Sequence, residues 1–177
     1  SGVWSGGKIP SSSLDKAKIE HAITLQNNQS VYDLSFIGES ASLTLNSKKL
    51  EVLDKLSAQS NNGFIGDSLA WIELEGENPS TISFKTDGQK LGSLVVNVES
   101  DSVYLLSALK IYEQLSTTSG FLNTQENDLK LFADSVKSAT YLKGTGKVIG
   151  DLSYQRKFHS SNSGWRMISA PVMSQNY

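Results

Sequence analysis

The chain has 177 residues, 16 basic and 18 acidic side chains, a formal net charge of -2 and no cysteine. This length suits one domain with a single core, and the charge balance lacks the basic footprint of a nucleic-acid-binding protein. No apolar run approaches the roughly 20 residues of a membrane span, and the missing cysteine excludes disulfides and thiolate chemistry.

The first 18 residues precede any regular pattern. They contain Trp4, Pro10 and two adjacent glycines. A segment of this kind is suited to cover the first exposed strands of a sheet, which otherwise invite association. We therefore predict that residues 1–18 form an N-terminal cap in which Trp4 plugs the core.

Between residues 19 and 154, apolar residues alternate with polar ones in short segments that are separated by turn residues. A period of two indicates strands with one buried face. Residues 50–59 also fit a short helix, but residues 109–118 share their pattern, and for both we favour a strand followed by a turn. Typical segments are Leu34-x-Phe36, Leu50-x-Val52, Ile72-x-Leu74 and Leu94-x-Val96-x-Val98.

These segments repeat at an interval of about sixty residues, a kind of period that is typical of stacked repeat architectures. Leu34 and its neighbours match Leu94 and its neighbours, and a third copy opens around Leu152. Each copy holds about six strands, which predicts two coils of about 30 residues with three strands each. We expect Leu34, Leu94 and Leu152 to lie on equivalent strands, two coils apart, and to point inward.

The sequence thus predicts an all-β fold, a right-handed parallel β-helix (solenoid) of about five coils. The rival is an antiparallel sandwich, which also has many short strands but does not require a sixty-residue self-match. We expect one domain over residues 1–177, with coils over 19–154. Residues 155–177 lose the alternation and are expected to form a C-terminal cap, with Trp165 over the last coil, or the start of a linker.

Two terminal segments carry a resemblance to a known group of proteins. Residues 1–10, SGVWSGGKIP, and the stretch around GWRMISAPV at residues 164–172 resemble segments that flank β-solenoid modules in large secreted proteins of Bacteroidetes-type bacteria. Such proteins are typically cargo of the type IX secretion route. The resemblance implies a secreted or cell-surface protein with further domains, and a carbohydrate-binding or adhesin module.

Residues suited to catalysis are sparse. His21 and His159 lie near opposite ends of the chain, and no Gly-x-Ser-x-Gly motif is present. The densest acidic group is Glu73, Glu75 and Glu77, and the matching position of a later copy holds Lys130. A solvated acidic face is favoured there over Ca²⁺ ligation or catalysis, so we predict no enzyme activity, metal or cofactor.

Outward aromatic residues indicate a binding function. Trp71, Tyr104 and Tyr112 each adjoin an apolar residue that is expected to face inward, so alternation points them outward. Glu73 and Glu75 lie on the same side as Trp71. Aromatic faces stack on sugar rings, and carboxylates accept hydrogen bonds from sugar hydroxyls. The predicted carbohydrate-binding residues are Trp71, Glu73, Glu75, Tyr104 and Tyr112.

If the strands around these residues stack on one face, Trp71, Tyr104 and Phe132 form an outward ladder with rungs about 4.8 Å apart. Three alternatives stay open for such a ladder. A loop or cap covers it, it stabilises the sheet through cross-strand contacts, or a partner domain of the full-length protein occupies it.

The function expected from the sequence is a non-catalytic carbohydrate-binding module that holds a plant or microbial polysaccharide along one sheet face. Its expected partners are that polysaccharide and neighbouring domains of a larger protein, with no nucleic acid, no membrane insertion and a monomeric state. The alternative is a spacer segment of a cell-surface adhesin without a glycan ligand. A polysaccharide lyase or hydrolase is disfavoured because the required carboxylate cluster is missing from the sequence pattern.

Overall fold

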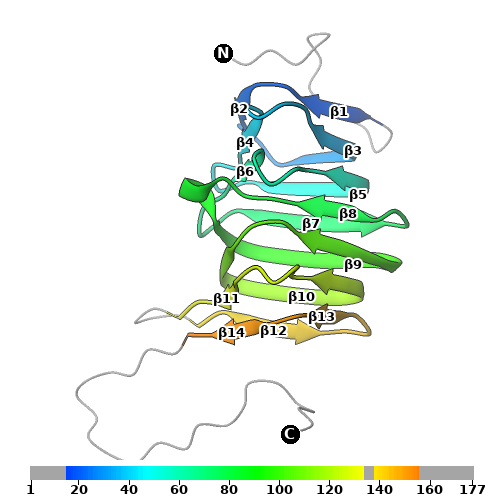
Figure 1. Ribbon diagram of the computed structural model, residues 1–177, viewed down its shortest axis with the longest axis vertical. Helices are drawn as coiled ribbons and strands as arrows, with labels where there is room; N and C mark the ends of the chain where they lie inside the picture. The colour runs from blue at the N-terminus through cyan, green and yellow to red at the C-terminus, as the bar shows by residue number, and fades with distance from the viewer. Residues whose placement is uncertain (1–14, 134–137, 156–177) are drawn as a thin grey trace, which may run out of the picture.

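The computed structural model describes residues 15–133 and 138–155, and the strands in these ranges stack into a β-solenoid of about six turns (Figure 1). Every pairing between the named strands is parallel. The predicted all-β parallel β-helix is therefore confirmed, with about six turns in place of five. An antiparallel sandwich is excluded.

The strands form one large sheet, in the order β1-β3-β5-β7-β9-β10-β11-β14 with β8, β12 and β13 at its side, and a small sheet β2-β4-β6. A single 3-10 turn, η1 (Thr86–Gly88), interrupts them among the described residues. The strands are β1 (Lys16–Ile19), β2 (Ala22–Thr24), β3 (Gln29–Phe36), β4 (Ser42–Thr44), β5 (Lys49–Ser57), β6 (Gly63–Ile65), β7 (Trp71–Gly76), β8 (Ser80–Ile82), β9 (Lys90–Leu105), β10 (Leu109–Asn123), β11 (Leu129–Leu131), β12 (Thr140–Lys143), β13 (Lys147–Ile149) and β14 (Leu152–Tyr154).

The core consists of columns of apolar side chains that run along the solenoid axis. Leu50, Ile72, Leu94 and Leu115 occupy facing positions on β5, β7, β9 and β10, and all four are buried. Their neighbours along each strand point to the opposite face, as the period of two in the sequence predicts. Burial of such a side chain contributes roughly 1.5–3 kcal/mol relative to exposure.

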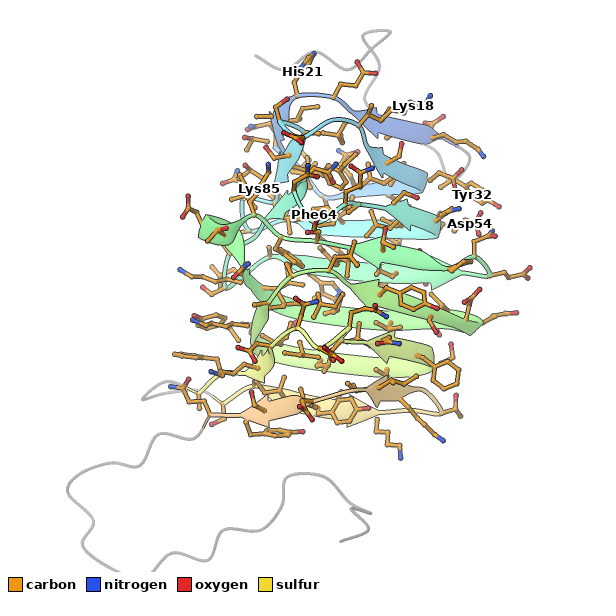
Figure 2. All side chains as sticks on the ribbon, in the orientation of Figure 1. Lys18, His21, Tyr32, Asp54, Phe64 and Lys85 are labelled. Carbon is orange, nitrogen blue, oxygen red and sulfur yellow. The ribbon has the colours of Figure 1, made fainter. Side chains whose placement is uncertain are left out.

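A column of three phenylalanines fills another part of the core. Phe36 and Phe64 meet edge to face with ring centroids 5.1 Å apart, and Phe64 and Phe84 lie 5.6 Å apart. Figure 2 shows Phe64 among the side chains inside the stack. Aromatic pairs in these geometries add stability beyond the area they bury.

Polar side chains tie the turns of one coil to the next. The side-chain amides of Asn46, Asn62 and Asn127 each donate a hydrogen bond to a carbonyl about one coil earlier in the chain, at 3.2, 3.2 and 2.9 Å. The Nζ atom of Lys85 donates to the carbonyls of Glu39 and Asn61, both at 2.7 Å. These bonds satisfy carbonyl groups at the turns and strand ends.

Gly63 shows why one turn requires glycine. Its φ is +122°, and a Cβ atom there would collide with the carbonyl oxygen of Ser83 on the next coil. Any other residue would therefore suffer both backbone strain and a clash at this corner.

The predicted spacing of the repeat is wrong. Facing residues such as Gln29 and Leu50, or Leu50 and Ile72, lie about 21 or 22 positions apart, so a coil is shorter than the expected 30 residues. Sixty residues therefore span nearly three coils. The self-match arose because strands with a period of two resemble one another at many offsets.

The expected equivalence of Leu34, Leu94 and Leu152 is wrong for the same reason. Leu34 faces Leu56, whereas Leu94 faces Ile72, and Leu152 pairs with a third column through Leu129. Leu34 and Leu94 are nonetheless buried, and Leu152 is partly buried against the core. Alternation thus identifies the inward residues without identifying their column.

The predicted ends are tested only in part. β1 begins at Lys16, inside the segment predicted as a cap over residues 1–18, and pairs with β3. Trp4, Trp165 and the predicted C-terminal cap beyond residue 155 lie outside the described residues. Their capping role stays a prediction.

Leu94 lies in the middle of its column and is fully buried. We expect Leu94→Ala to lower the free energy of unfolding by roughly 2–5 kcal/mol, because it opens a cavity that neighbouring coils cannot fill. Chemical denaturation of both proteins measures the loss. Leu142→Ala, at a side chain that is 51% exposed, is the control and should change stability little. Equal stability of Leu94→Ala and the wild type would contradict the core assignment.

Candidate functional site

Trp71, Glu73 and Glu75 project from one side of β7, as the sequence predicts. Ile72 and Leu74 between them are buried, whereas Trp71 is 37% exposed and the two glutamates are half-buried. A strand fixes this division because its successive side chains point to opposite faces. β7 therefore presents an indole and two carboxylates in a row on the outer wall.

The neighbouring strand adds a third carboxylate. Glu51 on β5 faces Glu73 in register, and carboxylate oxygens of Glu51, Glu73 and Glu75 all lie within 4.8 Å of one another. We call these three residues the acidic cluster. Three negative charges so close together are costly unless positive charge or hydrogen-bond donors lie beside them.

Lys49 supplies that positive charge. Its Nζ atom lies 2.6 Å from a carboxylate oxygen of Glu73 and 3.4 Å from one of Glu51. The same atom lies 5.5 Å from the centroid of the Trp71 ring, within the range of a cation–π contact. Lys49 thus holds the indole next to the acidic cluster, and part of the indole remains exposed.

These contacts shift two pKa values. The hydrogen bond with Glu73 is the main cause that raises the pKa of Lys49, which keeps its ammonium charged. Partial burial raises the pKa of Glu75 above its ordinary 4.5, and the carboxylates of Glu73 and Glu51 raise it further. Glu75 therefore accepts a proton more readily than an ordinary glutamate does.

Carboxylate oxygens are also ligands of hard cations such as Ca²⁺. In this cluster, however, Glu73 already accepts a short ion pair from Lys49. Glu51 also lies 3.4 Å from Lys49, so Glu75 is the member of the acidic cluster whose carboxylate forms no ion pair with Lys49. The arrangement therefore suits the hydroxyl groups of a neutral ligand better than it suits a divalent cation.

A polar groove opens at the end of β7 and shares Glu75 with the acidic cluster. Tyr32 and Asp54, both labelled in Figure 2, line its wall together with Asn97. The side chain of Asn78 donates a 2.8 Å hydrogen bond to Asp54, and Ser119 donates one of 3.0 Å to Asn97. The lining residues are Tyr32, Leu53, Asp54, Glu75, Gly76, Glu77, Asn78, Asn97, Glu99 and Ser119.

The groove residues Tyr32, Asp54 and Asn97 were not predicted from the sequence. Asn97 faces Glu75 across β7 and β9, a pairing that a coil length of about 22 residues would have revealed. The sixty-residue self-match did not indicate this pairing. With the correct coil length, polar residues of neighbouring coils line up beside Glu75.

Tyr104 and Tyr112 do not join Trp71. Tyr104, near the end of β9, faces Thr81 on β8. Tyr112 stacks on Phe132 with ring centroids 4.6 Å apart. Both are half-buried on outward positions.

The predicted aromatic ladder of Trp71, Tyr104 and Phe132 is therefore wrong. Trp71 faces Lys49 on one side and Ser93 on the other. Tyr104 lies on the part of β9 that pairs with β8, whereas Trp71 on β7 pairs with an earlier part of β9.

A comparison with known protein families, curated proteins and solved structures found no match to this chain. Its fold and the chemistry of its surface are therefore the evidence on function. In the ranges that the structure describes, no helix has the length and apolar character that a membrane span requires.

Glu75 gives the stability of the protein a pH dependence of known sign. Because its pKa is raised in the folded state, its favourable contribution is present below its unfolded pKa and is lost as pH rises through the folded pKa. We expect Glu75→Gln to melt at a temperature equal to or above that of the wild type at neutral pH, and the gain to vanish at acidic pH.

Thermal melting between acidic and neutral pH measures this difference. Glu77→Gln, at an exposed glutamate that directly follows β7, is the matched control for the loss of one negative charge. A Glu75→Gln variant that melts below the wild type at neutral pH would contradict a raised pKa of Glu75 in the folded state.

Proposed function

We propose that this solenoid is a non-catalytic carbohydrate-binding module whose glycan lies against Trp71, the acidic cluster and the adjoining groove. One observation carries this proposal. An exposed indole lies on the same face of the sheet as three closely spaced carboxylates, and that row continues into a groove lined by amide, carboxylate and phenol groups. Stacking planes beside hydrogen-bonding groups are what sugar rings require.

The dimensions suit a short stretch of glycan. From Trp71 to Glu75 the strand advances by about 13 Å, at roughly 3.3 Å per residue, and the groove lengthens the path beyond Glu75. A sugar stacked on the indole would place its hydroxyls over Glu73, and the following sugars would reach Glu75 and Asn97. All these groups belong to strands of one sheet, so little ordering is needed before binding.

The charge of the site favours a neutral glycan. Three carboxylates against one Lys49 ammonium leave the row negative, and the groove adds Asp54, Glu77 and Glu99. Such a surface repels uronate or sulfate groups and accepts hydrogen bonds from uncharged sugar hydroxyls.

The proposal also includes the location of the module and its neighbouring domains. The flanking motifs and the polar, weakly charged composition support a monomeric module of a larger secreted or cell-surface protein. Its neighbours would be other domains of that protein.

A spacer segment of an adhesin is the second candidate, and a specific observation favours it. Trp71 contacts Lys49, and Tyr112 stacks on Phe132, so these aromatic side chains already have partners within the protein. In a spacer these contacts only stabilise the wall, and no glycan binds.

The test is affinity electrophoresis of the wild type against neutral xylans, glucans and mannans. Trp71→Ala should weaken binding by up to about tenfold, because an aromatic stacking contact contributes about 0.5–1.5 kcal/mol by analogy with other aromatic pairs. Leu142→Ala, another exposed apolar residue, is the control and should bind normally. Thermal melting of both variants should stay close to the wild type.

Two results would count against this function. If the wild type is retarded by none of these polysaccharides, the spacer is favoured. If Trp71→Ala loses thermal stability and keeps its affinity, Trp71 serves packing alone.

A further inference from the structure

Three lysines occupy facing positions on three successive coils. Lys90 on β9 faces Lys110 on β10, and Lys110 faces Lys130 on β11. All three project outward, because the residue that follows each of them is buried in the core. At roughly 4.8 Å per coil, this lysine ladder is about 10 Å long.

The lysine ladder lacks the neutralisation found elsewhere on the wall. Lys16 and Lys49 each form an ion pair with a carboxylate on a neighbouring coil, at 2.6 Å in both cases. Within the described residues, no carboxylate forms an ion pair with any member of the ladder. Like charges at facing positions destabilise a sheet, so an external anion would relieve a repulsion that the fold leaves in place.

The surroundings of the ladder form a binding surface. All three lysines line a shallow depression together with Thr86, Gln89 and Asp128. Asp128 is the acidic residue of that depression, so the surface keeps a positive balance. Hydroxyl and amide groups beside ammonium groups suit a ligand that is both charged and rich in hydroxyls.

An aromatic pair adjoins the ladder. Tyr112 on β10 and Phe132, which directly follows β11, lie two positions after Lys110 and Lys130, and their rings lie 4.6 Å apart with an angle of 35° between them. Both residues are half-buried. Apolar ring surface beside positive charge distinguishes this face from a purely electrostatic patch.

We propose that Lys90, Lys110 and Lys130 bind a linear acidic polysaccharide, one that carries carboxylate groups on its sugars. Its chain runs along the solenoid axis, with two or three carboxylates over the ladder and the sugar rings beside Tyr112 and Phe132. The ladder is separate from the acidic cluster, so this inference does not rest on the function proposed for Trp71.

The size of the ladder favours this ligand over other polyanions. Nucleic-acid-binding surfaces carry a broad basic footprint, whereas this chain has a net charge of -2 and its ladder holds three lysines. A uronate polymer is narrow, offers ring faces as well as carboxylates, and needs only one line of positive charge.

The test uses the full chain and polygalacturonate, with affinity measured by titration calorimetry at low and at raised salt. The triple variant Lys90→Gln, Lys110→Gln, Lys130→Gln should lose at least tenfold in affinity. Its matched control is Lys18→Gln, Lys55→Gln, Lys143→Gln, which changes the net charge equally at three exposed lysines on other parts of the wall. The control should keep at least half of the wild-type affinity.

Measurements of thermal stability distinguish a loss of binding from a loss of folding. Because the triple substitution in the ladder removes a repulsion between facing charges, the variant should melt at or above the temperature of the wild type. Lys110→Gln alone, at the centre of the ladder, should show an intermediate loss of affinity. Fully methyl-esterified polygalacturonate, which keeps the backbone and loses the charge, should not bind the ladder.

Several results would overturn the proposal: no binding of polygalacturonate by the wild type, equal losses in the ladder and control variants, or equally tight binding of inorganic polyphosphate, which has charge but no sugar rings. Trp71→Ala distinguishes the two sites. Normal binding of polygalacturonate by this variant supports the ladder as an independent site even if no neutral glycan binds, and a lost affinity would contradict it.

Discussion

The structure depends on the parallel hydrogen bonding between successive coils. A short strand such as β7 has no partner within its own coil, so the carbonyl and amide groups of its backbone are satisfied by β5 before it and β9 after it. A slip by one residue would turn every apolar side chain of the strand to the outside. Coil length is therefore held near 21 or 22 residues over much of the stack, with register shifts where β3 pairs with β5 and where β9 pairs with β10.

This constraint converts distant sequence positions into columns of contacts. Similar residues are favourable where they meet inside the core, as in the contacting rings of Phe36, Phe64 and Phe84. On the outer wall the chemistry of a column decides its effect. Opposite charges at facing or diagonal positions attract, as Lys49 and Glu73 do, while facing like charges repel.

The extent to which the fold can be predicted follows from the same geometry. Alternation within one strand is a local property, so the inward positions of Leu50 and Leu94 and the outward row of Trp71, Glu73 and Glu75 could be predicted from the sequence. The alignment of residues into columns could not be predicted. It depends on how many residues each corner contains, and neither the composition nor the period of the sequence determines that number.

The candidate site contains both residues that the sequence identifies and residues that it does not. Its members on β7 are neighbours within one strand, and the sequence identifies them. Lys49 and Glu51 contribute from the coil before, and Asn97 from the coil after. These residues become visible only when the register is known, and the same is true of the facing positions of Lys90, Lys110 and Lys130.

On the outer wall of a solenoid the sheet fixes the positions of the side chains, whereas the chemical nature of these side chains can vary. The core requires apolar residues at alternate positions, and the corners require residues such as Gly63 that fit against the next coil. The outward positions between them must only tolerate a strand, so their side chains can change without a change of register. Because the hydrogen-bonded sheet sets the spacing of these side chains in advance, a row or a column of them presents a ligand with groups at regular intervals and at little entropic cost. The fold could therefore be predicted from a pattern, whereas the function depends on which side chains the register brings together on the wall.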